Sequence, residues 1–311
     1  MPPEKRVIVI GAASLDVMGQ PIGVPEPATS NPAHVRTSFG GVARNVAENL
    51  ARLGQTVSLI SAVGKDDLGA QLLHHTASAG VDVSRCLQIS DVGTAAYIAI
   101  LDEKGNLYYG LDDMTILRHI SSSYLRSLAD LFAESALIFV DANLSPATLR
   151  TVFSLANRYK IPVCADATST ILAKRIQNYI PRLFLLNANR SEASALLGSG
   201  FEVNDAASAL SAARQFIRMG VEIAVIPIAE GGVCYATSET SGHIPAVLTR
   251  IVDSIGAGDA LTATTIFGIL NDMDIDEAIR LGVTAASLTL THPGAVVPNL
   301  SLELLYERLM I

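Results

Sequence analysis

Short apolar runs alternate with longer helical segments along most of the chain, and this order constrains the fold more than any other feature. The runs lie at residues 7–10, 57–63, 137–140, 163–165, 184–186 and 224–228. Helical patterns lie at residues 42–53, 126–133, 146–159, 206–219, 276–290 and 302–309. Strands that alternate with helices form parallel sheets with helices on both faces. The sequence therefore predicts one α/β domain over residues 1–311, built on a doubly wound, mostly parallel sheet.

One segment interrupts this alternation. Residues 95–101 and 106–111 flank Asp102-Glu103-Lys104-Gly105, a sequence typical of a hairpin turn. A short strand is also expected at residues 35–39, after a loop at residues 19–32 that holds four prolines. The segments near 15–39 and 95–112 are therefore expected to form a small β-sheet beside the main one.

Charge and the N-terminus limit the kinds of partner. The formal net charge is −8, which argues against binding to nucleic-acid phosphates. The apolar run after the first six residues is too short for a signal peptide or a membrane span. We therefore expect a soluble, cytoplasmic protein that binds neither nucleic acid nor membrane.

The stretch D-S-I-G-A-G-D, residues 253–259, joins a turn of small residues to a buried helix at 260–270. N–H groups at a helix start have no partner inside the helix, and Gly256, Ala257 and Gly258 leave them open to an anion. Asp259 lies in the first turn, where its carboxylate is expected to stay ionised. The pattern indicates a phosphate cradle beside a base, although a glycine-rich helix start with an ordinary acid would also explain it.

Polar residues follow several of the predicted strands. They are Asp16, Asp141, Asp166 and Asn187. Ligands of open parallel sheets bind beyond the carboxyl ends of the strands, so these four residues are expected to form a polar rim. Each one alone could simply cap a strand.

Three common enzyme motifs are absent from the sequence. It has no G-x-x-x-x-G-K-[ST], no G-x-G-x-x-G after the first strand and no G-x-S-x-G. These absences disfavour a P-loop enzyme, a dinucleotide dehydrogenase and an α/β-hydrolase.

The chain resembles the ribokinase-like (PfkB) sugar kinases over nearly its whole length. The likeness rests on five motifs in order: Gly11 with Asp16, G-G-V-A-R-N at 40–45, G-K-D-D-L-G at 64–69, N-R-S-E at 189–192 and D-S-I-G-A-G-D at 253–259. Within the family, S-N-P-A-H-V-R-T-S-F-G-G-V-A-R-N and A-A-Y-I-A-I-L-D-E-K-G-N-L-Y-Y-G-L-D-D-M are most similar to pseudouridine kinases.

This resemblance implies ATP- and Mg²⁺-dependent phosphorylation of the 5′-hydroxyl of a ribosyl nucleoside, with pseudouridine as the expected substrate. Asp259 would be the general base, and Gly256, Ala257 and Gly258 the anion hole for the transferring phosphoryl group. The ribose would be held by four residues: Asp16, Gly40, Gly41 and Asn45.

The resemblance also implies a nucleotide and cation site. Asn189 and Gly232 would lie at the nucleotide, and Glu192 would bind Mg²⁺ through water. Asp253 would help to bind a monovalent cation such as K⁺, together with the backbone near Ile255 and Gly294.

The small sheet would then be a lid over the sugar that excludes water, and in relatives such a lid can also form a homodimer interface. Choice of the base would come from residues around it. The candidates are Asn31, Arg44, Tyr97 and Met114.

One departure from the family pattern affects the nucleotide site. Family members usually carry T-x-G-x-x-G, or the same with serine, where this chain has P-I-A-E-G-G. Pro227 offers no hydroxyl and no N–H, and Ala229 replaces a glycine. Two alternatives therefore stay open: ribokinase or another sugar or nucleoside kinase of the family, and a catalytically weak protein that only binds a sugar or nucleoside.

Overall fold

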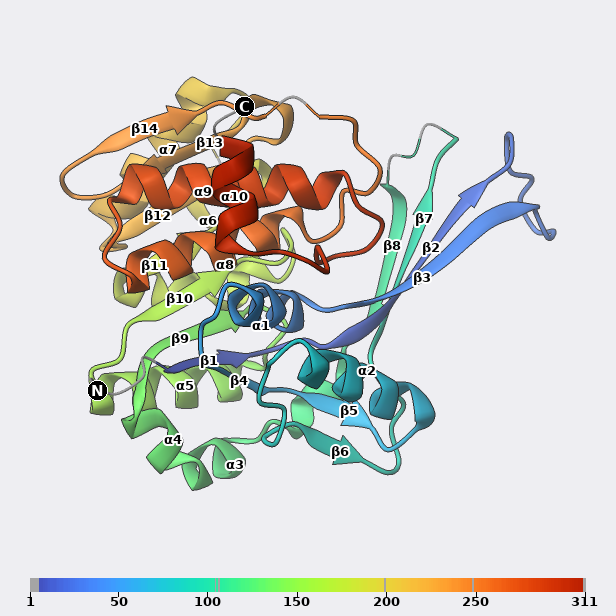
Figure 1. Cartoon of the computed structure of the whole chain (residues 1–311), viewed down its shortest axis with the longest axis horizontal. Helices are drawn as coiled ribbons and strands as arrows, with labels where there is room; N and C mark the ends of the chain where they lie inside the picture. Colours follow the sequence, from blue (N-terminus) through green and yellow to red (C-terminus); the bar gives the residue numbers. More distant parts are fainter. Residues whose placement is uncertain (1–5, 104, 106, 199, 248, 310–311) are drawn as a thin grey trace.

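An eight-stranded sheet forms the centre of the molecule in the computed structural model, which describes residues 6–103, 105, 107–198, 200–247 and 249–309 (Figure 1). Its strand order is β14-β13-β12-β11-β10-β9-β1-β4. The strands are β1 Arg6–Ile10, β4 Val57–Ile60, β9 Ser135–Asp141, β10 Val163–Asp166, β11 Leu185–Asn187, β12 Ile223–Pro227, β13 Val233–Ala236 and β14 Ser241–Ile244. All pairings from β4 to β12 are parallel, and β13 and β14 add an antiparallel edge.

Helices cover both faces of this sheet, as the alternation predicted. Ile8 and Ile10 of β1 pack into one buried cluster with α5, α6 and α7, whereas Val7 and Val9 pack into another with α1, α8, α9 and α10. Successive residues of a strand point to opposite faces, so one buried strand contributes to both cores. The helices are α1 Val42–Arg52, α2 Asp67–Ser78, α3 Ser122–Ser127, α4 Ala129–Ala133, α5 Pro146–Tyr159, α6 Arg190–Leu197, α7 Ala206–Arg218, α8 Ala257–Leu270, α9 Ile275–Leu290 and α10 Leu302–Leu309.

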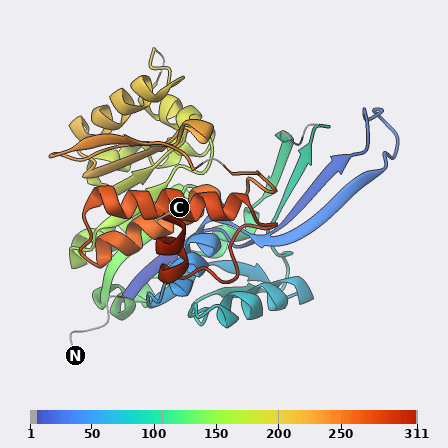
Figure 2. The same ribbon diagram turned by 45° about the horizontal axis from the view of Figure 1, so that its top comes forward.

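A second, four-stranded sheet projects from the body, and both views show it (Figures 1 and 2). Its order is β3-β2-β7-β8, with β2 and β7 parallel and the outer pairs antiparallel. The strands are β2 Ser14–Pro21, β3 Ala33–Gly40, β7 Ala96–Leu101 and β8 Leu107–Asp113. The segments predicted to form the small sheet do so, whereas Lys104 and Asn106 of the predicted hairpin lie outside the described residues.

Several elements differ from the predicted ones. The expected strand at 57–63 is divided into β4 and a short β5, Ala62–Gly64, which pairs with β6, Leu87–Ile89. Between them, the Ser61 hydroxyl donates to the Gly11 carbonyl at 2.7 Å. The helix expected at 126–133 is two short helices, because the backbone leaves helical geometry at Leu128. The start of the expected loop at 19–32 instead continues β2 as far as Pro21.

The remaining short elements are 3₁₀ helices of three to six residues. They are η1 Thr115–His119, η2 Ala173–Arg175, η3 Gln177–Arg182 and η4 Ala229–Gly231. In the described part of the chain, no helix is long and apolar enough to cross a membrane.

Candidate active site

Three residues of the predicted polar rim lie at the carboxyl edge of the main sheet, whereas the fourth, Asp16, lies on β2 of the small sheet. Asp141 ends β9, Asp166 ends β10 and Asn187 ends β11, and their registers place Asp166 opposite both neighbours. The Asn187 amide donates to Asp166 at 2.8 Å. Asp141 and Asp166 therefore bring two carboxylates to adjacent strand ends, where ligands of such sheets bind.

Asp141 has a structural task in this rim. Its carboxylate accepts hydrogen bonds from the backbone N–H groups of Ala12 at 2.7 Å, Ala43 at 3.2 Å and Asn143 at 3.0 Å. A Cβ at Gly11 would lie 2.2 Å from one of its oxygens. Asp141 thus ties the turn after β1 to the first turn of α1, which carries the predicted sugar-binding residue Asn45.

The absence of side chains at Gly40 and Gly41 leaves space for the Asp16 carboxylate and for the backbone at Ala12, respectively. Asp16 lies on β2, and a Cβ at Gly40 would come within 2.0 Å of its carboxylate. Gly41 has φ +92°, and a Cβ there would lie 2.4 Å from the Ala12 carbonyl oxygen. Burial raises the pKa of Asp16 to about 6, although a hydrogen bond from Ser14 at 3.0 Å opposes this shift. Asp16 is therefore a buried acceptor beside a bare stretch of backbone.

Two of the predicted site residues meet although they are distant in sequence. The Asn45 amide nitrogen donates to an Asp259 carboxylate oxygen at 2.7 Å, which joins α1 to the first turn of α8. The Asn45 carbonyl oxygen accepts from the Arg44 guanidinium. Arg44 thereby fixes the orientation in which the amide N–H of Asn45 faces Asp259.

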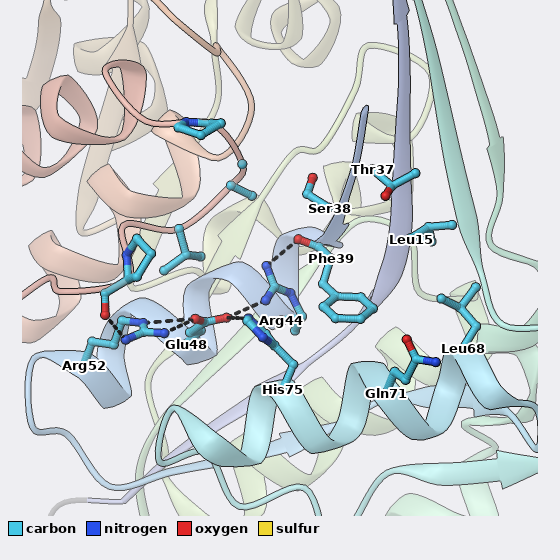
Figure 3. Close-up of a pocket in the computed structure, with 15 residues that line it drawn as sticks. Leu15, Thr37, Ser38, Phe39, Arg44, Glu48, Arg52, Leu68, Gln71 and His75 are labelled. Carbon is cyan, nitrogen blue, oxygen red and sulfur yellow. Dashed lines mark hydrogen bonds and ion pairs between the residues drawn. The ribbon is translucent and has the colours of Figure 1, made fainter. Parts of the chain in front are cut away.

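Arg44 itself is buried, so the prediction that it helps to choose the base is wrong. It is 1% exposed, pairs with Glu48 and donates to the carbonyl groups of Phe39 and Gly40. Figure 3 shows Arg44, Glu48 and Arg52 linked along α1, with His75 of α2 beside Glu48 at 3.6 Å. These groups line a cavity of about 560 Å³. Removing Glu48 would leave the buried Arg44 guanidinium without its ion-pair partner, which would destabilise the protein.

The protonation state of the Asp259 carboxyl group differs from the one that we predicted. α8 begins at Ala257 rather than at residue 260, with Gly256 as its N-cap at φ +81°, so Asp259 lies in the first turn as expected. Burial, followed by the charge of Asp166, raises the pKa of Asp259 to about 8, against the opposing hydrogen bond from Asn45. The expectation that it stays ionised is therefore wrong for the free protein at neutral pH.

We predict that this ionisation controls the pH dependence of the reaction. Because a general base must lose its proton, kcat/KM should rise with pH and level off above about pH 8, the pKa of Asp259. Steady-state rates across this pH range measure the effect. Glu192, whose pKa is also raised to about 8, supplies the control: Glu192→Gln should keep the rise. A flat profile in the parent enzyme would contradict the assignment.

The N-R-S-E motif starts α6 with a capping box. The Asn189 side chain accepts from the Glu192 N–H at 3.0 Å, and the Glu192 carboxylate accepts from the Asn189 N–H at 2.9 Å. This local structure explains the spacing without a ligand, so nucleotide binding by Asn189 stays a prediction. Burial and Asp166 raise the pKa of Glu192.

The same region could hold a divalent cation. Burial also raises the pKa of Asp166, and the Asn187 side-chain oxygen is buried without a hydrogen-bond partner. Oxygen ligands and nearby carboxylates suit Mg²⁺, which keeps several waters and takes few protein ligands. No three His, Cys, Asp or Glu residues of the described chain converge on one metal position. The chemistry of these residues therefore suits Mg²⁺ held through water and phosphate, and the role of Glu192 stays a prediction.

Gly232 and Ala229 shape the turn after β12. Gly232 has φ +94°, and a Cβ there would lie 2.1 Å from the Ile244 carbonyl of β14. The close contact with β14 explains why a glycine is needed at position 232. The role of Gly232 in nucleotide binding therefore stays a prediction. Ala229 has φ +52°, a left-handed conformation that disfavours a side chain. The turn thus keeps a glycine-like shape although it lacks the family's glycine.

We predict that Pro227→Thr combined with Ala229→Gly tightens KM for ATP more than it raises kcat. The threonine would add a hydroxyl donor to the turn, and the glycine would relieve the conformation of Ala229. Initial rates over a range of ATP concentrations measure both constants. Ala229→Gly alone separates the backbone effect from the hydroxyl, and an unchanged or higher KM in the double variant would contradict the prediction.

Of the remaining candidates for base recognition, Asn31 lies in a loop and Tyr97 lies within the small sheet. The Asn31 side chain stabilises its own loop. Its oxygen accepts a hydrogen bond from the Glu26 N–H at 2.8 Å, and its nitrogen donates one to the Glu26 carbonyl at 2.9 Å. Tyr97 pairs across the small sheet with Asp16 on one side and Asp112 on the other. Burial raises the pKa of Tyr97, and these two carboxylates add to the shift.

Met114 lines a second cavity, of about 380 Å³, between the end of β8 and the main sheet. Three of its polar lining residues, Asp112, Asn143 and Arg175, are absent from the sequence-based candidates. Asp112 could have been found, since it lies in the stretch G-L-D-D-M. Arg175 could not, because only the fold brings its guanidinium to the Asn143 carbonyl, at 2.7 Å.

Comparison with known proteins identifies the family. The model of the pfkB family carbohydrate kinases matches residues 4–301. The chain belongs to this family. It is therefore a kinase of the ribokinase-like group, a phosphotransferase that acts on a hydroxyl group of a sugar or nucleoside.

Individual members show the range of relatives. The chain is 31% identical over 297 residues to a pseudouridine kinase of Escherichia coli strain K12, covering 95% of this chain and 94% of that protein. It is 28% identical to a ribokinase of Haemophilus influenzae, covering 94% of both. A structure titled as a putative ribokinase II of E. coli with ATP and Mg²⁺ superposes with a TM-score of 0.85 at 16% identity, over 98% of this chain and 99% of that one.

Proposed function

We propose that the protein transfers the terminal phosphoryl group of ATP to the 5′-hydroxyl of pseudouridine. The observation that carries this proposal is a cavity whose lining residue Asp112 is aligned with the predicted sugar residue Asp16. Asp16, Tyr97 and Asp112 are aligned in register across three strands of the small sheet, so their side chains share one face. Asp112 also lines the 380 Å³ cavity, which is in the size range of small-molecule sites. A ribose at Asp16 would thus direct its base toward Asp112.

In this proposal, Asp259 takes the proton of the 5′-hydroxyl, and Asn45 holds the Asp259 carboxylate toward the substrate. The N–H groups at the start of α8 stabilise the negative charge of the transferring phosphoryl group. Asp16 accepts hydrogen bonds from the ribose hydroxyls above Gly40 and Gly41. Bound Mg²⁺, near Glu192 and Asp166, would supply positive charge that offsets the charge of the ATP phosphates.

The small sheet would act as a lid in this reaction. Asp16 belongs to this sheet and Asn45 to the main body, so a ribose held by both would bring the two parts together. Closure would exclude water, which competes with the sugar as phosphoryl acceptor. In this proposal the sheet of β2, β3, β7 and β8 contributes to catalysis by covering the bound sugar.

A homodimer through the lid is a second part of the proposal. β8 is an edge strand, and it exposes apolar side chains, among them Leu107, Tyr108, Tyr109 and Leu111. Exposed apolar edge strands tend to pair with another chain. Sedimentation velocity measures the state directly, and a monomer at micromolar concentration would contradict it.

The choice of base would be made at Asp112. Pseudouridine presents a ring N–H where uridine presents a C–H, and a carboxylate can accept a hydrogen bond from the former only. A site built to accept such a hydrogen bond discriminates strongly against the analogue that lacks the donor. The cavity also has Met114 as an apolar wall and Arg175 as a donor for the carbonyl groups of the base.

A competition assay tests the proposal. Pseudouridine, uridine, ribose and fructose are offered at equal concentration, and we expect kcat/KM to fall in that order. Asp112→Ala should reduce kcat/KM for pseudouridine by roughly ten- to a hundredfold, the range for hydrogen bonds to a charged group. Asp113→Asn is the matched control, since neighbouring residues of a strand face opposite sides and asparagine can still accept the hydrogen bonds from Thr115. If ribose or fructose is preferred, the family holds but the pseudouridine assignment fails.

A further inference from the structure

The carboxylate of Asp253, which was expected to help bind a monovalent cation, already has partners on both oxygens. One oxygen accepts from the Ile255 N–H at 3.1 Å. The other accepts from the Gly294 N–H at 3.1 Å and lies 3.3 Å from a guanidinium nitrogen of Arg36. The Asp253 side chain is only 1% exposed, so its negative charge is almost fully removed from water.

Arg36 comes from the other part of the molecule. It lies on β3 of the small sheet, opposite Met18 and two residues before Ser38, which pairs with Asp16. Residues two apart on a strand share a face, so Arg36 points from the small sheet toward the body, as Ser38 does. The Arg36 side chain is 40% exposed, and its partner belongs to the turn that starts α8.

A buried carboxylate needs a counter-charge, and a guanidinium is well suited to that task. Among the described residues, Arg36 is the cation that forms an ion pair with Asp253. A free monovalent cation at the same carboxylate would be repelled by the guanidinium at this short range. These residues therefore do not fit the cation site expected at Asp253.

We propose that Arg36 takes the place of a monovalent cation at Asp253 and positions the turn at residues 253–256. That turn also depends on the loop around Gly294, because a Cβ at Gly256 would lie 2.0 Å from the Ala295 carbonyl. Asp253 joins the two through its bonds to Ile255 and Gly294. Arg36 is thus a positioning residue that acts on the anion hole through Asp253 and ties the small sheet to it.

The first test is the dependence of turnover on salt, with whichever acceptor the enzyme uses. Wild-type rates should be the same within twofold in KCl, NaCl and choline chloride of equal ionic strength. Arg36→Gln should lose roughly fivefold in choline chloride, the upper range for one partly exposed ion pair, and regain it in KCl. The loss should fall on kcat, with KM for the acceptor little changed.

Two further variants control this experiment. Arg36→Lys keeps the charge and should behave as the wild type. Arg126→Gln removes one positive charge at an exposed position of α3 and should show no salt-specific effect. Activation of the wild type by K⁺ relative to choline, or an Arg36→Gln enzyme that equals the wild type in every salt, would overturn the proposal. So would a loss that no cation restores.

Crystals grown in RbCl give a second readout that does not depend on activity. We expect an anomalous rubidium signal at Asp253 in Arg36→Gln and none there in the wild type. A signal at Asp253 in the wild type, or in neither protein, would contradict the proposal. If no acceptor is phosphorylated, the proposed function fails, but the diffraction experiment still decides the role of Arg36.

Discussion

Asp259→Asn is expected to keep the fold and to lose turnover by roughly a hundred- to ten-thousand-fold, the usual contribution of a general base. Asparagine has almost the same shape and can still meet the Asn45 amide through its oxygen. It cannot take a proton from the acceptor hydroxyl. Single-turnover rates with saturating ATP and acceptor measure the loss at the chemical step. Near-normal kcat would show that Asp259 is not the base.

The stability of the same variant provides a control for folding. The pKa of Asp259 is raised from 3.8 to about 8 in the folded protein, so folding favours the protonated form. This carboxyl group therefore lowers the free energy of unfolding progressively as the pH rises from about 4 to about 8. Asp259→Asn removes that penalty. Urea denaturation should show a more stable variant at pH 8 and no difference below pH 4, whereas a less stable variant would indicate a structural role.

Gly256→Ala is expected to lower the free energy of unfolding by about 3 kcal/mol, the sum of a left-handed backbone and a displaced neighbour. Gly256 has φ +81°, and its added Cβ would meet the Ala295 backbone rather than a flexible side chain. Urea denaturation measures the change. A loss below about 1 kcal/mol would mean that the loop shifts freely, since overpacking usually costs at least that much.

Gly258→Ala is the matched control for this clash. A Cβ at Gly258 would meet nothing within 4 Å, and alanine favours a helix by about 0.5–1 kcal/mol over glycine. We expect a protein at least as stable as the wild type. Activity should nevertheless fall, because the methyl group would occupy the space proposed for the phosphoryl group. A fully active Gly258→Ala enzyme would place that group elsewhere.

The main sheet could be predicted because its strands are buried on both faces and read as continuous apolar runs. β2 escaped prediction because it contains Gly19 and ends at Pro21, residues that are rare inside isolated strands. It is stable here because β3 and β7 pair with it on both sides. β13 and β14 were missed as well, because they pair antiparallel after β12 and fall outside the alternation of strands and helices.

The motifs singled out Asn45 and Asp259, which the structure joins by a hydrogen bond. They did not predict the protonation of Asp259 or the residues that surround it. The glycines of 40–41 and 256–258 indicated close backbone approach, and the structure gives each of Gly40, Gly41 and Gly256 a specific neighbour. The raised pKa of Asp259 depends on its burial and then on the charge of Asp166, which lies on β10. The ion pair of Arg44 was detectable in principle, because Glu48 follows four residues later on the same helix, but its burial was not.

The hydrogen bond between Asn45 and Asp259 spans 214 residues of the chain. During synthesis on the ribosome, α1 leaves the exit tunnel long before α8 is translated. The core on the face of the sheet that α1 covers also needs α8, α9 and α10, so it is complete only when the C-terminal helices have emerged. Only a nearly complete chain has both partners of this bond. Premature termination before residue 257 would therefore release a product that lacks Asp259 and also the helices that bury α1, which carries Asn45.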